Sequence, residues 1–320
     1  MFMFMLAGFF TAENELFASP EAPREKLLEP SGTYLYDEKG GQKLYLDIYD
    51  PAPESKTAYA DGTAKPSVLF LFGGGFVIGK RDHESYNPWF KALTDEGFKV
   101  ISIDYRLGMK DSGARGFAVI EAIHKAVEMA VEDLFSATAF LIDNAAELGI
   151  DPAAIVTAGS SAGAMTVLQA EWEISSRGPL AAVLPEGFDY AGVMSFSGAV
   201  FSDRGAIRYS GGSAPTLLFH GTADKIVPYN RNLRILKLQF SSSPALARFL
   251  RKDGAVCSFY RFKGAAHEIA SSMMRNLEEE LQFIEMNVVR KDRRVVDATV
   301  EDPSIPPFRN LSLKQMYNNN

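Results

Sequence analysis

The stretch Ile155-Val-Thr-Ala-Gly-Ser-Ser-Ala-Gly-Ala164 decides how this chain of 320 residues is interpreted. Its apolar, β-prone first four residues lead into Gly159-Ser-Ser-Ala-Gly163, and a helix-forming run follows. A strand, the pattern G-x-S-x-G and a helix, in this order, predict a sharp turn with a nucleophilic serine at its apex. Glycines on both sides of the turn let the strand and the helix approach each other. We therefore predict that Ser161 is a nucleophile beside a helix N-terminus, whose N–H groups and dipole favour negative charge.

Short apolar runs alternate with helix-like segments along most of the chain. The apolar runs are typical of strands buried on both faces, and they occupy residues 67–72, 99–104, 155–158, 191–196, 215–219 and 256–262. The segments with helical spacing are 88–96, 116–148, 231–240, 244–250 and 269–289. This alternation predicts an α/β fold, with a mainly parallel sheet and helices on both of its faces. Two alternating segments, 34–36 and 44–49, predict antiparallel edge strands, which brings the sheet to about eight strands.

We expect one domain over residues 31–290, between a leader (1–30) and a tail (291–320). Residues 1–10 are continuously apolar and the next stretch is polar, so the leader resembles a secretory signal with a cleavage site near Ala18, although no Lys or Arg precedes it. This pattern favours export, to the periplasm or the medium, over a cytoplasmic location. The tail contains prolines and ends in a run of asparagines, which predicts a surface segment. No other stretch is long and apolar enough to span a membrane.

The composition limits the partners of the protein. Hydrophobic residues make up 47% of the chain, which is enough for one sizeable core. The net charge of -7, without a cluster of Lys and Arg, argues against nucleic-acid binding. The only cysteine, Cys257, excludes an intramolecular disulfide and is expected to be a buried small hydrophobe. We expect a small-molecule substrate and no metal or organic cofactor, and the sequence carries no signal of oligomeric state.

A serine nucleophile needs a base, and the chain offers four histidines. His124 lies inside a helical run, and His83 precedes the serine, just after a glycine-rich loop. His220 ends a strand directly before Gly221-Thr-Ala-Asp224, and we expect it to stabilise that loop. His267 lies in a loop of small residues between the last strand and the last helix. This position makes His267 the best candidate for the base.

The group that orients the base is predicted to be Asp224, just beyond the end of a buried strand. Ligands of open parallel sheets bind at the carboxyl ends of the strands, so Ser161, Asp224 and His267 are expected to converge there. The alternative for Asp224 is a turn or capping residue. A competing acid, Asp203, lacks a comparable strand-loop context.

The transition state needs donors for its oxyanion, and the loop Phe72-Gly-Gly-Gly-Phe76 after a buried strand can supply them. Three glycines allow the backbone to approach a substrate carbonyl and direct N–H groups at it. We assign this role to Gly74 and Gly75, together with Ala162, the residue after the nucleophile. A phosphate-binding loop is disfavoured because the Gly-Lys-Ser/Thr ending is missing.

Together these motifs resemble the α/β-hydrolase superfamily. More narrowly, they resemble its esterase/lipase group with a His-Gly-Gly-Gly loop, which includes hormone-sensitive-lipase-like and feruloyl- or acetyl-esterase-like enzymes. The matching segments are Gly73–Phe76, Asp104–Leu107, Asn144–Pro152, Gly159–Gly163, His220–Asp224 and His267. Phe72 replaces the usual leading histidine, so the loop is either looser or fixed by packing of Phe72. The short connection between the strands near Phe196 and Thr216 indicates a small cap or none, and hence short acyl groups.

The resemblance implies a serine carboxylic-ester hydrolase that acts on short-chain acyl esters, with acetylated or feruloylated carbohydrates as candidate substrates. In such an enzyme His267 takes the proton of Ser161 and Asp224 orients the imidazole. Two alternatives stay open. The same triad serves an amidase, a peptidase or an arylformamidase, and a catalytically silent hydrolase fold serves binding alone. The intact Ser/Asp/His set disfavours the second alternative.

Overall fold

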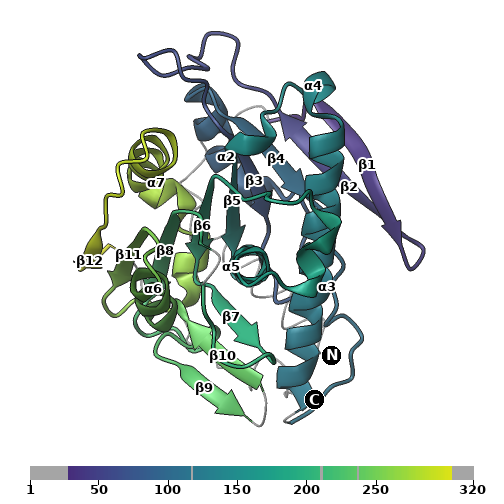
Figure 1. Ribbon diagram of the computed structural model, residues 1–320, viewed down its shortest axis with the longest axis vertical. Helices are drawn as coiled ribbons and strands as arrows, with labels where there is room; N and C mark the ends of the chain where they lie inside the picture. Colours follow the sequence, from purple (N-terminus) through teal and green to yellow (C-terminus); the bar gives the residue numbers. More distant parts are fainter. Residues whose placement is uncertain (1–27, 117, 210–211, 236–237, 305–320) are drawn as a thin grey trace.

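A central β-sheet organises the computed structural model, which describes residues 28–116, 118–209, 212–235 and 238–304 (Figure 1). Within this described part the sheet has nine strands, against about eight expected. Their order across the sheet is β1 (Gly32–Lys39), β2 (Gln42–Tyr49), β4 (Lys99–Ile103), β3 (Ser67–Leu71), β5 (Ile155–Ser160), β6 (Gly192–Phe196), β8 (Thr216–Gly221), β11 (Cys257–Phe262) and β12 (Asp297–Val300). β2 pairs antiparallel with β1 and with β4, and the other neighbouring pairs are parallel. The predicted mixed, mainly parallel sheet is confirmed.

The central strands are buried along their whole length, because helices cover both faces of the sheet. Every residue of β3, β5, β6 and β8 is buried, as the continuous apolar runs predict. The helices are α2 (Asn87–Asp95), α3 (Ala118–Asp143), α4 (Ala145–Leu148), α5 (Ala162–Ser175), α6 (Ser243–Lys252) and α7 (Leu277–Phe283). The shorter turns are η1 (Glu84–Tyr86), η2 (Pro152–Ala154), η3 (Pro179–Val183), η4 (His267–Ser271), η5 (Met273–Asn276) and η6 (Ile284–Val289). The long helical run at 116–148 is therefore two helices, and Gly149 ends the second with a φ of 61°.

The prediction of a helix at 231–240 is wrong. This segment begins a hairpin of β9 (Asn232–Ile235) and β10 (Leu238–Ser242), and β10 also pairs antiparallel with β7 (Ala199–Ser202). These three strands form a separate sheet in the described part of the chain, below called the small sheet (Figure 1). Apolar residues alternate with polar ones in each half of the hairpin, which suits strands, and pairing with β7 satisfies backbone groups that a helix would satisfy internally.

The end of the chain also differs from expectation. The single helix predicted at 269–289 is broken into η4, η5, α7 and the π-helical turn η6. Between η4 and α7 the Asn276 side chain donates to the Ser272 carbonyl oxygen at 3.0 Å, an acceptor that the Asn276 N–H also uses at 3.1 Å. Part of the expected tail, β12, extends the sheet by pairing in parallel with β11.

The leader and the end of the tail predicted from the sequence cannot be compared with the structure. The proposed leader up to residue 27, with its cleavage site near Ala18, and the tail beyond residue 304 lie outside the described residues. The domain boundaries stay a prediction. Among the described helices none combines the length and the apolar character needed to cross a membrane.

Candidate active site

Ser161 lies at the junction of β5 and α5 with a strained backbone. Its φ of 49° and ψ of −108° are unusual for a residue with a Cβ. Two hydrogen bonds hold this conformation: the Ser161 N–H donates to the Phe196 carbonyl oxygen, and the Met165 N–H donates to the Ser161 carbonyl oxygen, both at 2.9 Å. The strain is therefore fixed by β6 on one side and by the first turn of α5 on the other.

The two glycines of the turn are required by close contacts. A Cβ on Gly159 would lie 2.3 Å from the carbonyl carbon of Gly163, and a Cβ on Gly163 would lie 2.1 Å from the Leu71 carbonyl oxygen. Both neighbours are backbone atoms of the core, which cannot move aside. The predicted reason for Gly159 and Gly163 is confirmed.

The structure brings together the three residues that the sequence singles out for catalysis. Ser161 Oγ lies 2.7 Å from Nε2 of His267, which begins η4. Nδ1 of the same imidazole lies 2.8 Å from Oδ2 of Asp224, in the loop after β8. The three residues follow β5, β8 and β11, so they meet at the carboxyl ends of parallel strands.

Asp224 is buried and held by several donors. Its Oδ1 accepts hydrogen bonds from the N–H groups of Ile226 at 2.8 Å and Val227 at 3.0 Å. Burial alone raises the pKa of this carboxyl, but the neighbouring His267 and hydrogen bonds with His220 and His267 outweigh burial and hold the pKa well below its usual range. Asp224 is therefore an anion at neutral pH, and it can both orient the imidazole and stabilise its cation.

His220 supports the loop that carries the acid, as its position in the sequence predicts. Its side chain is fully buried, with Nε2 at 2.9 Å from the Val227 carbonyl oxygen and at 3.3 Å from Asp224 Oδ2. Nδ1 lies 2.7 Å from Ser243 Oγ at the start of α6. These contacts tie the Asp224–Val227 loop to α6.

The other candidates have different surroundings. His83 caps η1 by accepting the Ser85 N–H through Nδ1. His124 is buried on α3, where its ring contacts Phe201 with 5.5 Å between the centroids. The competing acid Asp203 is exposed directly after β7. No cluster of three or more His, Cys, Asp or Glu residues suited to a metal ion occurs in the described ranges.

The glycine loop passes next to the nucleophile. A Cβ on Gly73 would lie 3.4 Å from Ser161 Cβ, while Gly74 and Gly75 have φ values of 123° and 63°, a region open mainly to glycine. Gly75 and Ala162 line the same pocket as Ser161. Ala162 is also the first residue of α5, where helix N–H groups lack intrahelical partners. This placement fits the predicted oxyanion donors, whose role remains a prediction.

Phe72, which replaces the usual histidine, is fixed by packing. Its ring stacks on Tyr105 with 4.3 Å between centroids and 21° between planes. The Tyr105 hydroxyl donates to the Phe72 carbonyl oxygen at 2.7 Å, and the Gly73 N–H donates to the Tyr86 hydroxyl at 3.1 Å. The sequence analysis left two possibilities, a looser glycine loop or a loop fixed by packing of Phe72, and the structure supports the second. The sequence motif Asp104–Leu107 contains Tyr105, but the pattern alone gave no sign of its contact with the loop.

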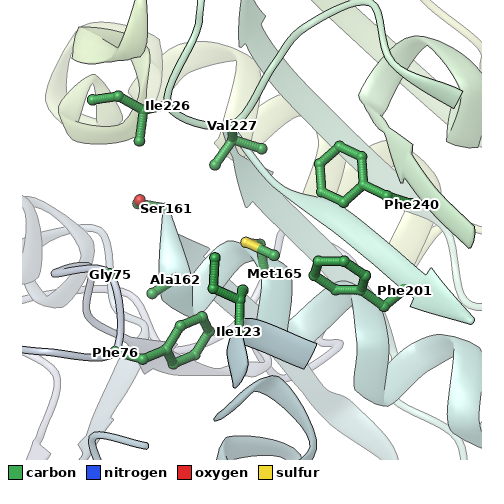
Figure 2. A pocket seen from close by; sticks show the side chains of 10 residues that line it. All are labelled: Gly75, Phe76, Ile123, Ser161, Ala162, Met165, Phe201, Ile226, Val227 and Phe240. Carbon is green, nitrogen blue, oxygen red and sulfur yellow. The ribbon is translucent and has the colours of Figure 1, made fainter. Parts of the chain in front are cut away.

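An apolar pocket opens beside Ser161 (Figure 2). It is lined by Gly75, Phe76, Ile123, Ser161, Ala162, Met165, Phe201, Ile226, Val227 and Phe240. Phe76 lines this pocket, whereas Trp89 and Tyr86 are buried elsewhere, and Trp89 Nε1 donates to Glu280 Oε2 at 2.8 Å. Phe201 and Phe240 come from the small sheet. Sequence reasoning missed both, because it placed Phe240 on a helix and recognised no strand at β7.

Comparison with known families decides the class of the protein. The profile of the Phospholipase/Carboxylesterase family matches residues 117–285, more than half of the chain, and the matched region contains Ser161, Asp224 and His267. The chain belongs to the phospholipase/carboxylesterase family. A second profile, BD-FAE, matches residues 46–173, which include the glycine loop and Ser161.

Individual curated relatives are similar to parts of this chain. Non-reducing polyketide synthase ausA of Aspergillus calidoustus is 38% identical over 93 residues, which cover 28% of this chain and 4% of the relative. Esterase B1 of Culex pipiens is 33% identical over 107 residues, which cover 33% of this chain and 18% of the relative. The matched part is thus less than a fifth of the length of either curated relative.

Among solved structures, the apo form of Thermogutta terrifontis esterase 2 is similar with a TM-score of 0.58 and 23% identity, over 83% of this chain and 97% of that one. This likeness concerns the fold. The family profile and the fold together confirm the predicted α/β-hydrolase superfamily.

Proposed function

We propose that this member of the phospholipase/carboxylesterase family hydrolyses carboxylic esters of small molecules through Ser161, His267 and Asp224. The observation that carries the proposal is the continuous chain of contacts, 2.8 Å from Asp224 to His267 and 2.7 Å from His267 to Ser161. These distances are within the reach that proton transfer requires. The acid is anionic and buried, as the orienting member of such a set must be.

The reaction follows from these contacts. His267 Nε2 takes the proton of Ser161 Oγ as the oxygen attacks the acyl carbon, and the N–H groups of Gly74, Gly75 and Ala162 stabilise the resulting oxyanion. Collapse of this intermediate breaks the bond to the alcohol, which leaves with the proton held by the imidazole. Water then gives a proton to His267 and attacks the acyl-enzyme. Release of the carboxylic acid returns the proton to Ser161.

The acyl group is proposed to be short. The pocket beside Ser161 is lined almost entirely by apolar side chains, and its volume is about 40 Å³. Since about 10–15 Å³ of such volume holds one water molecule, the pocket has room for only a few heavy atoms. Among carbohydrate esters, acetylated substrates therefore suit it better than feruloylated ones.

The test is a series of p-nitrophenyl esters from acetate to laurate, measured on the wild type and on Ser161→Ala together. We expect kcat/KM to fall with chain length, and the alanine variant to lose at least about 10⁴-fold of kcat. Matched anilides measured in the same way test the amidase alternative, since a faster anilide reaction would favour it. Ester hydrolysis that persists in a pure, folded Ser161→Ala preparation would refute the proposal.

A further inference from the structure

Two phenylalanines of the small sheet form a pair at the pocket. Phe201 on β7 and Phe240 on β10 are directly opposed in the antiparallel register. Residues opposed in this way point to the same face of a sheet. Their ring centroids are 5.1 Å apart with 61° between planes, an edge-to-face contact typical of stable aromatic pairs.

The pair lies away from the reacting atoms. In Figure 2 the two rings stand on the opposite side of the pocket from Gly75 and Ala162, with Met165 and Ile123 nearer the middle. An acyl chain whose carbonyl carbon lies at Ser161 Oγ, with its oxygen toward the glycine loop, therefore extends toward the two rings. They occupy the position where the end of the chain would lie.

Phe201 is held rigidly. Its side chain is 2% exposed, its N–H donates to Gln169 Oε1 of α5 at 2.9 Å, and its ring contacts His124 of α3. Phe240 is only partly buried, and the small sheet continues beyond it to Leu233, which is opposed to Phe240 in the register and 43% exposed. The row from Phe201 through Phe240 to Leu233 thus passes from the core to the surface.

We propose that the Phe201–Phe240 pair is the end wall of the acyl pocket and sets the longest acyl chain that the enzyme accepts. The inference rests on the proposed function, because it assigns the acyl group to this pocket. Each methylene that the wall excludes loses its apolar burial, which corresponds to about a four-fold loss in kcat/KM. Removing Phe240 opens the pocket toward Leu233, whereas removing Phe201 opens it toward α3.

The experiment compares the ratio of kcat/KM for p-nitrophenyl octanoate to that for p-nitrophenyl acetate. We expect Phe240→Ala to raise this ratio at least ten-fold. Phe201→Leu, which keeps much of the buried volume, should raise the ratio less. Phe249→Ala on α6 is the matched control, because Phe249 is also partly buried but does not line the pocket, and it should leave the ratio unchanged.

The outcomes separate the two proposals. If no ester is hydrolysed in a manner that depends on Ser161, the proposed function fails. If hydrolysis depends on Ser161 but folded Phe240→Ala and Phe201→Leu keep the wild-type ratio, only the end wall is refuted. Phe240→Leu replaces the alanine variant if the latter does not fold.

A separate observation concerns the glycine loop. The Phe72 carbonyl oxygen accepts from Tyr105, and the Gly73 N–H donates to Tyr86, so both polar atoms of one peptide group are bound by tyrosine hydroxyls. This peptide begins the loop that presents Gly74 and Gly75. Rotation of the peptide group would break both bonds, and it would turn the N–H groups that follow.

We infer that Tyr86 and Tyr105 are positioning residues for the oxyanion donors, in the place of the histidine that Phe72 replaces. Tyr105→Phe and Tyr86→Phe remove one hydroxyl each, and we expect kcat to fall about ten-fold with little change in KM. Affinity for a trifluoromethyl ketone, which forms an oxyanion on Ser161, should weaken by a similar factor. The control is Tyr190→Phe, a buried tyrosine whose hydroxyl lies 2.7 Å from Thr138 Oγ1. If the loop variants match this control in kcat and in inhibitor affinity, the inference is overturned.

Discussion

The central sheet and the small sheet contribute to the site in different ways. The central sheet supplies Ser161, Asp224 and His267 from loops that follow its parallel strands, all anchored in a core buried on both faces. The small sheet supplies side chains only, from three short antiparallel strands that run from buried β7 to β9, where Leu233 is 43% exposed. On the proposed function, the chemistry depends on backbone geometry fixed by the core, and we expect the selectivity for the acyl group to depend on side chains of the small sheet.

The largest difference between the two sheets is expected in catalysis. Asp224→Asn after β8 should lower kcat by about 10⁴-fold, because the amide no longer fixes the required tautomer of His267 or stabilises its cation. The matched control is Asp203→Asn directly after β7, an exposed position, which should change kcat by less than two-fold. Both values come from initial rates on p-nitrophenyl acetate. Comparable losses of kcat in the two variants would contradict the proposal that the central sheet, and not the small sheet, carries the catalytic acid.

The next difference concerns folding. Gly163→Ala places a Cβ 2.1 Å from the Leu71 carbonyl oxygen, so we expect a loss of about 3 kcal/mol or more in the free energy of unfolding. Gly205→Ala, after β7, tests backbone conformation alone, because Gly205 has a positive φ of 102° but an added Cβ would meet open space, and the expected loss is about 1 kcal/mol. Urea denaturation measures both. Equal losses would contradict the inference that close packing against Leu71 requires glycine at position 163.

The same contrast explains which parts of the molecule the sequence predicts. The elbow could be predicted because its pattern from Gly159 to Gly163 is contiguous in the sequence, and the central strands could be predicted because burial on both faces leaves a continuous apolar run. The positions of Asp224 and His267 followed from a general property of parallel sheets.

The parts that depend on pairing between distant segments could not be predicted. The alternation of apolar and polar residues within β9 and β10 suits strands but is too short to exclude a helix, and the partner strand β7 lies some 30 residues earlier in the chain. The aromatic pair at the pocket was missed for the same reason. Similarly, the clamp on the Phe72–Gly73 peptide joins Tyr86 and Tyr105 from segments that meet only in the folded chain.

A smaller effect, a dependence of stability on pH, is expected at Glu280 of α7. This carboxyl is fully buried against Trp89, and burial raises its pKa well above the usual value. The folded state therefore holds the proton more tightly than the unfolded state. Above the unfolded pKa of about 4.3, stability falls as the pH rises, by up to about 1.4 kcal/mol for each pH unit, until the pH passes the folded pKa.

Glu280→Gln removes this dependence while keeping an oxygen that accepts the Trp89 N–H. We expect the variant to be more stable than the wild type at pH 8, with a smaller or no gain at pH 5, in thermal melts at both values. Glu278→Gln, exposed on the same helix, should show no such difference. Ester hydrolysis by Glu280→Gln should equal that of the wild type, because the site does not include this group. An equal gain in stability at pH 5 and pH 8 would show that the raised pKa of Glu280 is not the cause.

The smallest effect in the wild-type background tests how the small sheet works. Leu233 on β9 is opposed to Phe240 and 43% exposed, and it does not line the pocket, so Leu233→Lys should change stability by less than about 0.5 kcal/mol and leave the acyl preference unchanged. In the Phe240→Ala background the opened pocket reaches this position, and a charged side chain there would meet the end of a longer acyl chain. The double variant should therefore lose most of the gain in octanoate hydrolysis that Phe240→Ala alone produces. Coupling is expected only between residues that share a partner, here the acyl chain. If the effects of the two substitutions on octanoate hydrolysis are additive, long acyl chains do not extend past position 233.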